Sequence, residues 1–167
     1  MDKQAIYALL TERRIPYEVT EHPAVFTMEE LSRVAVPYPE ADAKNLFVRD
    51  DKKRNYYLIT VKGNKRVDLK AFRRAQGLRP LTFATAQELW DKLALTPGSV
   101  TPLGVLNGQA AQVQVYLDED FQAEPGRIGV HPNDNTATVW LAVADLLTLL
   151  REQGNPVALA PIPEVIE

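Results

Sequence analysis

Two apolar runs at residues 43–49 and 56–61 are separated by a short polar segment and together predict a β-hairpin. Further alternating segments follow at 113–117, 127–130 and 138–143. The last two are joined by turn residues with no helical pattern between them, which argues against a strict βαβ rhythm. The sequence therefore predicts an α/β (α+β) fold, a single domain in which helices surround a mixed, largely antiparallel sheet.

Capping patterns mark the predicted helices. Asp2 precedes an apolar helical stripe over 2–13, Asp68 precedes a basic helix that Gly77 would end, and a last helix over 145–153 would stop at Gly154. The residue pairs Thr27/Glu30 and Thr85/Glu88 have the form of capping boxes. A short strand is expected at 17–20.

The chain has 167 residues, which suits one domain, and we expect residues 1–154 to form it. The Pro-rich tail 155–167 should be extended, and should pack loosely or fray. Cysteine is absent, which excludes disulfides, thiolate nucleophiles and Cys-based zinc sites and suits a reducing cytosol. No long apolar run or signal peptide is apparent, so we expect a cytoplasmic protein that does not enter a membrane.

Charge is distributed unevenly along the chain. The net charge is −3, yet residues 44–79 contain twelve Lys or Arg and only three Asp. A basic segment in an acidic protein is typical of a face that meets a phosphate backbone. A solvated helix and hairpin would give the same composition, and charge alone slightly favours that simpler interpretation.

Several catalytic motifs are missing. The sequence has no phosphate-binding glycine loop and no Gly-x-Ser-x-Gly elbow. His22 and His131 lie far apart in sequence, and neither has a second ligand at a metal spacing, so no metal or cofactor is expected. A site that joins both histidines to a carboxylate is not favoured. The acidic run 118–120 is interpreted as a solvated turn.

Lys44 lies inside the first hairpin strand, next to Asn45 and an apolar run. A half-buried lysine needs an anionic partner or a phosphate to offset its desolvation. A lysine on an exposed edge strand, which protects against aggregation, fits the same pattern. The pattern alone leaves these two interpretations equal.

Two loops are further candidates for a site. Residues 98–102 begin with a glycine, which lets a ligand approach the backbone, and end with a proline, which stiffens the wall. His131 opens the polar cluster 131–136. Taken singly, the first is more typical of a connector and the second of a turn histidine.

Taken together, these segments resemble the YbaK and prolyl-tRNA synthetase-associated editing-domain family. The likeness is greatest to its freestanding alanyl-tRNA(Pro) deacylase branch, also called ProXp-ala or PrdX. It runs over nearly the whole chain and rests on the segments 22–27, 43–50, 55–58, 65–70, 98–102 and 128–136. Each segment is moderately specific, and their shared order and spacing carry the resemblance.

The resemblance implies an activity and a set of site residues. The activity is hydrolysis of alanine mischarged onto tRNA(Pro), without a metal or cofactor. Lys44 matches the essential lysine of the family, Asn45 its neighbouring asparagine, and His131 the histidine of the pocket. The pocket wall is expected to comprise Val25, Phe26, Thr27, Gly98, Ser99, Val100, Thr101 and Pro102.

The basic segment would then bind the acceptor end of tRNA(Pro). The residues expected to do so are Lys52, Lys53, Arg54, Lys62, Lys65, Arg66, Lys70, Arg73 and Arg74. We expect Lys44 to anchor the tRNA end, backbone N–H groups at 98–101 to stabilise the oxyanion, and Asn45 and His131 to fix the α-amino group or water. A monomer is expected, with prolyl-tRNA synthetase as a further partner. Alternatives are a deacylase for cysteinyl- or seryl-tRNA, a non-catalytic tRNA- or synthetase-binding module, and a small-molecule hydrolase.

Overall fold

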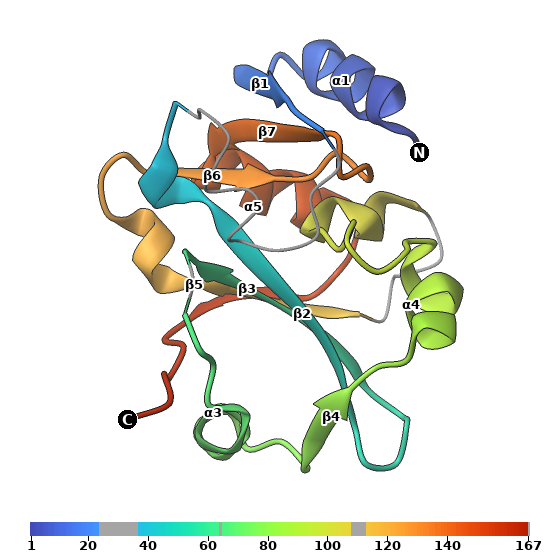
Figure 1. Ribbon diagram of the computed structural model, residues 1–167, viewed down its shortest axis with the longest axis vertical. Helices are drawn as coiled ribbons and strands as arrows, with labels where there is room; N and C mark the ends of the chain where they lie inside the picture. Colours follow the sequence, from blue (N-terminus) through green and yellow to red (C-terminus); the bar gives the residue numbers. More distant parts are fainter. Residues whose placement is uncertain (24–36, 64, 108–112, 167) are drawn as a thin grey trace.

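The computed structural model describes residues 1–23, 37–63, 65–107 and 113–166, and its strands form two sheets (Figure 1). The larger sheet has five strands in the order β4-β2-β3-β5-β8, and the smaller has three in the order β1-β7-β6. The α+β class and the largely antiparallel pairing are confirmed. The prediction of one sheet is wrong, since the hydrophobic pattern marks strands without specifying their partners.

The predicted hairpin forms the middle of the larger sheet. It consists of β2 (Ala43–Asp50) and β3 (Tyr56–Lys62), which pair antiparallel with Lys44 opposite Val61. β4 (Leu81–Phe83) continues the antiparallel order beside β2. On the other side, β5 (Gln114–Asp118) and β8 (Val157–Ala160) pair in parallel.

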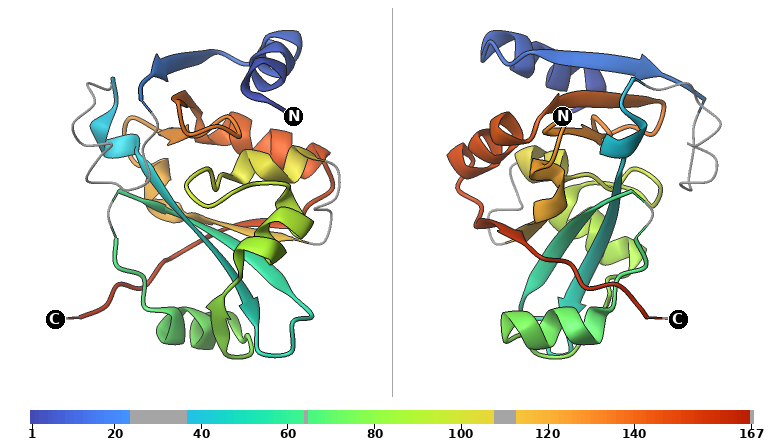
Figure 2. Two further views of the ribbon diagram at one scale, coloured as in Figure 1. Left: turned by 45° about the vertical axis from the view of Figure 1, so that its right-hand side comes forward. Right: turned by 90° about the vertical axis from the view of Figure 1, so that its left-hand side faces the viewer.

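The smaller sheet is antiparallel throughout and brings together distant parts of the chain. β1 (Tyr17–Glu21) pairs with β7 (Ala137–Ala142), which also pairs with β6 (Arg127–Val130). This pairing places β1, near the N-terminus, beside the last strands before the C-terminal helix. Figure 2 shows α1 (Lys3–Glu12) at this end of the molecule and α3 (Leu69–Gln76) at the other.

The helices begin where the capping residues predict. The Asp2 and Asp68 carboxylates accept from the amides of Ala5 and Ala71, while Thr85 and Glu88 complete a capping box at α4 (Ala86–Leu93). Gly77 ends α3 with a φ of 70°, which favours glycine. The remaining helices are α5 (Val143–Glu152) and the short 3-10 helices η1 (Pro39–Ala41), η2 (Pro102–Asn107) and η3 (Glu119–Gln122).

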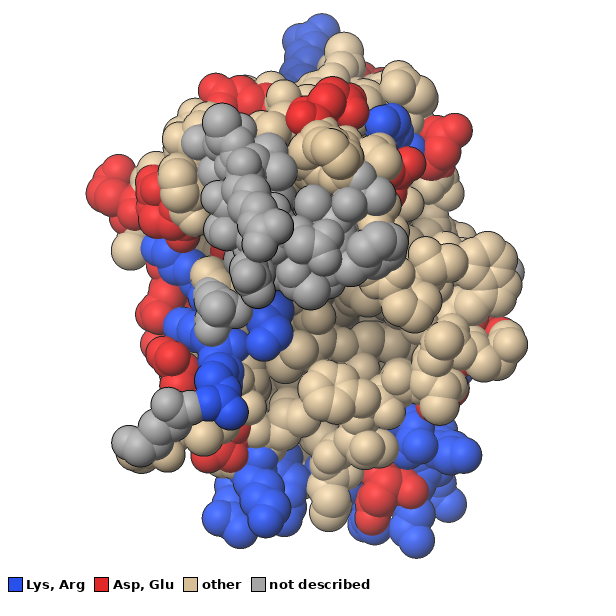
Figure 3. Space-filling view, viewed as in Figure 1, with Lys and Arg blue, Asp and Glu red and all other residues tan. Residues whose placement is uncertain are grey.

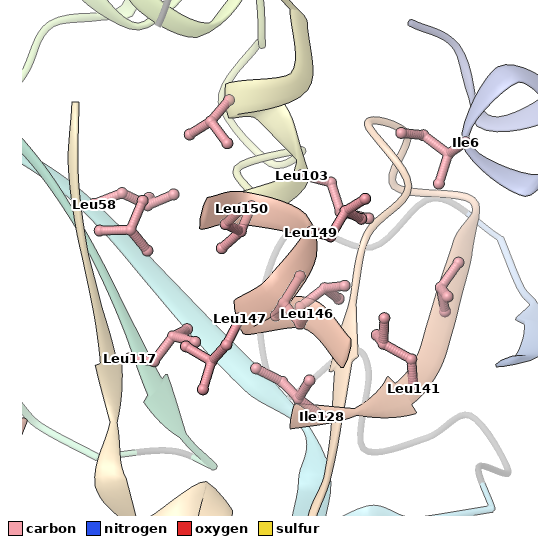
Figure 4. Close-up of a cluster of buried hydrophobic side chains, with 14 of the residues drawn as sticks. Ile6, Leu58, Leu103, Leu117, Ile128, Leu141, Leu146, Leu147, Leu149 and Leu150 are labelled. Carbon is pink, nitrogen blue, oxygen red and sulfur yellow. The ribbon is translucent and has the colours of Figure 1, made fainter. Parts of the chain in front are cut away.

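A large apolar core lies between the sheets. Figure 4 shows leucines of α5 packed between Leu58 and Leu117 of the larger sheet and Ile128 and Leu141 of the smaller. A second cluster lies on the other face of the larger sheet, where Phe72 of α3 packs against β2, β3 and β5. Both faces of the β2–β3 hairpin are therefore buried over part of their length, which makes it a rigid platform.

The C-terminal tail completes the larger sheet. Its residues 157–160 form β8, the strand that pairs with β5, and Ile162 is buried in the second cluster. The Asp68 amide donates to the Pro163 carbonyl (2.9 Å), and the Val165 amide donates to the Arg66 carbonyl (2.8 Å). The tail is extended, as expected, but over these residues it is packed rather than frayed.

Candidate functional site

The two faces of β2 separate the neighbouring residues Lys44 and Asn45. Successive side chains of a strand point to opposite faces. Phe47 packs into the large core, and Asn45 shares its face, whereas Lys44 shares the face of Leu46, which packs into the second cluster. The Asn45 Oδ1 accepts a hydrogen bond from the Thr60 hydroxyl (2.7 Å). Asn45 therefore supports the hairpin from the face opposite to Lys44.

Lys44 is held by the segment that follows β3. Its half-buried ammonium donates to the backbone carbonyl of Lys65 at 3.3 Å. The Lys65 ammonium in turn lies 2.6 Å from carboxylate oxygens of both Asp118 and Asp120. Burial lowers the pKa of Lys65, but these two carboxylates outweigh it and the net pKa is raised. These two ion pairs therefore hold Lys65 in place, and its backbone carbonyl accepts the hydrogen bond from Lys44.

The acidic run 118–120 has a different role from the solvated turn expected. The Asp118 side chain is fully buried, and it accepts from the Lys62 amide (3.0 Å) as well as from Lys65. The sequence-based interpretation is wrong for Asp118, because the pairing of β3 with β5 brings lysines to a carboxylate that looked exposed. Asp118 and Asp120 share a cation, which makes them structural partners of the Lys44 segment.

A β-bridge carries His131 to the neighbourhood of Lys44. Asp42 and Gly129 form an isolated parallel bridge between the start of β2 and the middle of β6. Lys44 and His131 each lie two residues further along in the same direction. Since residues i and i+2 of a strand share a face, Lys44 lies on the side that Asp42 faces, and His131, one residue past the end of β6, would lie on the same side if the alternation continues. Figure 1 shows β2 starting beside β6 and then running away from it.

His131 has a defined tautomer and a lowered pKa. Its Nδ1 lies 3.1 Å from the Ala137 carbonyl, which can only accept, so Nδ1 carries the proton and Nε2 presents a lone pair. Burial lowers the pKa of His131, with a smaller contribution in the same direction from His22. The imidazole is therefore suited to accept a hydrogen bond rather than to carry charge.

His22 lies beside His131 despite their separation in sequence. The ring centroids are 6.3 Å apart in a tilted arrangement. His22 is 8% exposed, its Nδ1 contacts the Pro23 carbonyl (2.9 Å), and its Nε2 contacts the Thr138 hydroxyl (3.0 Å). A site with both histidines is not favoured by the sequence, because only the pairings of β7 with β1 and β6 bring them together.

The loop 98–102 lies against the large core. Val100 packs on it, Thr101 is fully buried, Pro102 is buried, and Ser99 is 8% exposed. The Ser99 amide donates to the Thr96 carbonyl (3.0 Å), so it cannot also bind an oxyanion. Gly98 has a φ of 92°, which requires glycine. Among the described residues, no hydrogen bond or ion pair joins this loop to Lys44 or His131.

The basic residues fall into two groups. Lys52, Lys53, Arg54, Arg66, Lys70 and Arg74 are exposed, whereas Lys62, Lys65 and Arg73 are partly buried. The three partly buried side chains donate to protein oxygens. Lys62 donates to the Asp120 carbonyl, Lys65 to the carboxylates of Asp118 and Asp120, and Arg73 to the Leu78 carbonyl. In Figure 3, basic side chains gather over α3 and over the tip of the β2–β3 hairpin, on either side of an uncharged, hollowed surface.

Three expected wall residues, Val25, Phe26 and Thr27, lie outside the described residues, as does the helix expected to begin at Thr27. Within the described ranges, no three His, Cys, Asp or Glu side chains cluster as metal ligands would. In the same ranges, no helix has both the length and the apolar content to cross a bilayer.

A family model for the aminoacyl-tRNA editing domain matches residues 22–149, which run from the end of β1 through most of α5. The chain belongs to the aminoacyl-tRNA editing domain family. This confirms the family resemblance inferred from the sequence. Lys44, His131 and the 98–102 loop all lie within the matched range.

Relatives of this editing-domain protein extend over nearly its whole length. The prolyl-tRNA editing protein ProX of Acetoanaerobium sticklandii is 39% identical over 153 residues, which cover 92% of this chain and 93% of that protein. The prolyl-tRNA synthetase associated domain-containing protein 1 of Mus musculus is 34% identical, and the match covers 83% of each. A solved structure described as a candidate trans-editing enzyme for prolyl-tRNA synthetase superposes with a TM-score of 0.71 at 25% identity, over 98% of this chain and 97% of that one.

Proposed function

We propose that this protein is a trans-editing deacylase, which hydrolyses the ester between alanine and the terminal ribose of mischarged tRNA(Pro). The observation that carries the proposal is the 39% identity to a prolyl-tRNA editing protein over 92% of the chain. The geometry supports it, because the Asp42–Gly129 bridge brings together the segments that carry Lys44 and His131. These four residues mark one corner between the two sheets. Prevention of Pro-to-Ala mistranslation would follow from this activity.

Lys44 would anchor the end of the tRNA. Its ammonium has three donors, and the one described partner is a neutral carbonyl at 3.3 Å. A phosphate or ribose oxygen of the terminal nucleotide offers a stronger, charge-assisted hydrogen bond. Because Lys65 is fixed by two carboxylates, its carbonyl would hold Lys44 in place while the remaining donors bind substrate.

His131 would act as a hydrogen-bond acceptor. With its proton on Nδ1, the Nε2 lone pair can orient the attacking water or a substrate hydroxyl. The aminoacyl ester is already activated, so orientation of water and stabilisation of the oxyanion suffice for hydrolysis. The neighbouring ribose hydroxyl would assist the water, as in a substrate-assisted reaction.

Selection among amino acids would be steric. A site that attracts a single methyl group gains only about 1–3 kcal/mol, whereas a rigid wall excludes a larger side chain more strongly. The 98–102 loop supports such a wall, since it is anchored on the large core. Alanine would be accepted and proline excluded.

The exposed basic residues would bind the acceptor stem. Lys52, Lys53 and Arg54 at the hairpin tip and Lys70 and Arg74 on α3 are exposed, and basic side chains of these two elements lie on either side of the hollowed face in Figure 3. The surface between these two basic groups is uncharged. This arrangement suits a substrate whose phosphates contact the basic groups and whose sugar and amino acid bind between them. We further propose that the protein acts in the cytoplasm as a monomer and meets prolyl-tRNA synthetase there.

A substrate panel tests the proposal. Alanyl-, cysteinyl-, seryl- and prolyl-tRNA(Pro) would be incubated with the wild-type protein and with Lys44→Ala, and release of the amino acid measured. Preferred release of alanine by the wild type, lost in Lys44→Ala, would support the proposal. Preferred release of cysteine or serine would reassign the substrate, and tRNA binding without turnover would contradict a catalytic function.

A further inference from the structure

Asp42 is a buried carboxylate that the proposed chemistry has not used. Its side chain is 8% exposed, and its Oδ1 is buried without a hydrogen-bond partner among the described residues. Burial raises the pKa of Asp42 to about 6, with a smaller contribution from Glu40. Buried charges are normally paired, so an unpaired carboxylate is an unfavourable arrangement that the fold tolerates.

Asp42 lies at the corner that carries the candidate site. It immediately precedes β2 and lies two residues before Lys44. Its bridge partner, Gly129, lies two residues before His131. Its side chain points to the face of β2 that carries Lys44. A Cβ on Gly129 would lie 2.4 Å from the Trp140 ring, so only glycine leaves room at this corner.

No cationic side chain in the described part of the chain forms an ion pair with Asp42. Among the described residues, no ion pair reaches its carboxylate, and the neighbouring Lys44 ammonium bonds the Lys65 carbonyl instead. Glu40, the nearest carboxylate along the chain, is exposed and adds further negative charge. The Asp42 carboxylate therefore has no cationic partner among the described residues and is suited to bind a small cation.

The substrate of the proposed reaction carries such a cation. An alanyl ester has an α-ammonium group adjacent to the carbonyl that is hydrolysed. Asn45 lies on the face of β2 opposite to Lys44, and His131 offers only one uncharged acceptor, the lone pair on its Nε2. We propose that the Asp42 carboxylate binds the α-ammonium group of the aminoacyl ester and thereby selects aminoacylated over other ester substrates. This inference rests on the proposed function and specifies how the same site recognises its substrate.

The test compares two esters that differ at the α-position alone. Alanyl-tRNA(Pro) carries an ammonium group there, whereas lactyl-tRNA(Pro) carries a hydroxyl group of similar size. The variant is Asp42→Asn, which keeps the shape and removes the charge, and the matched control is Glu40→Gln on the exposed neighbour. For each protein, kcat/KM is measured with both esters, and its thermal unfolding is followed by circular dichroism.

We expect Asp42→Asn to lower kcat/KM for alanyl-tRNA(Pro) at least tenfold, since a hydrogen bond to a charged group is lost. For lactyl-tRNA(Pro) the change should be less than threefold, and Glu40→Gln should change neither. An equal loss on both esters, or no loss on the alanyl ester, would overturn the role of Asp42 while leaving the proposed function intact. If the wild-type protein hydrolyses no aminoacyl-tRNA(Pro), the proposed function fails, and this inference fails with it.

Discussion

Asp42 and Gly129 form a parallel β-bridge between the two sheets, and this contact orients the candidate site. It joins the start of the hairpin to β6, and Lys44 in β2 and His131 just after β6 each lie two residues past the bridge. Because the larger core holds both sheets against α5, the bridge has a rigid base on either side. The relative placement of the two side chains is thus a property of the fold rather than of a loop.

Loss of the Lys44 ammonium should abolish most of the activity without unfolding the protein. We expect Lys44→Ala to lower kcat for alanyl-tRNA(Pro) by about 100-fold or more, as when a preorganised donor is removed. Lys44→Arg should recover little, because a planar guanidinium does not reproduce the ammonium contact with the Lys65 carbonyl. Single-turnover deacylation measures both, with Arg151→Ala, an exposed substitution on α5, as the control. Near-normal turnover by Lys44→Ala would contradict the role assigned to it.

Gly129→Ala should destabilise the corner. The added Cβ would lie 2.4 Å from Cζ3 of Trp140, a fully buried side chain that cannot move away freely. Overpacking of this kind costs about 1–3 kcal/mol. Urea denaturation would measure the loss in free energy of unfolding. Combining the change with Trp140→Phe should cost less than the sum of the two single changes, since the smaller ring relieves the overlap. Additive losses would show that the clash is not the cause.

The local features of the fold were predictable from the sequence. The β2–β3 hairpin and the helix starts at Asp2, Asp68 and Thr85 depend on residues within a few positions of one another. Alternation within β2 also gave a reason to consider Lys44. Such signals act over short distances, so a single sequence contains them in full.

The long-range features were not predictable. His22 contacts His131 only because β1 and β6 pair with β7 on its two sides, and no periodicity specifies that pairing. The sequence suggests a solvated Asp118, whereas the parallel pairing of β5 with β3 places it beside Lys65. Asp42 was overlooked for the same reason, since its burial depends on β6, which lies more than 80 residues further along the chain. Charge and burial at the site depend on strand partners, which composition does not give.

Binding of tRNA should depend steeply on salt and more on the exposed lysines than on the buried ones. Each phosphate contact contributes a slope of about −0.9 to log Kobs against log salt concentration. We expect Lys53→Ala and Lys70→Ala each to reduce that slope by about 1, because both side chains are exposed beside the hollowed face.

The matched comparison is Lys62→Ala. Its ammonium is already engaged by the Asp120 carbonyl, so the slope should change little. Filter-binding titrations at several salt concentrations would measure these slopes with Lys44→Ala as the common background, which prevents turnover. Unchanged slopes for Lys53→Ala and Lys70→Ala would place the acceptor stem on another surface.

Asp42→Asn should stabilise the protein above neutral pH even as it lowers activity. The pKa of Asp42 is raised from 3.8 to about 6 in the folded protein, so folding favours the protonated form. Its contribution to stability therefore falls as the pH rises from about 4 to 6, and the full penalty, roughly 2–3 kcal/mol, applies above pH 6. The asparagine carries no charge, although its buried amide offsets part of the gain.

We expect the free energy of unfolding of Asp42→Asn to exceed that of the wild type by about 1–2 kcal/mol at pH 7.5. Near pH 4, where the wild-type carboxyl is itself protonated, the two should differ little. Urea denaturation at both pH values measures this difference. Glu40→Gln serves as the control, and its smaller effect should reflect only the repulsion that Glu40 exerts on Asp42. A variant that is less stable than the wild type at pH 7.5 would mean that the Asp42 charge is paired within the fold, and the carboxylate would then not be available to a substrate cation.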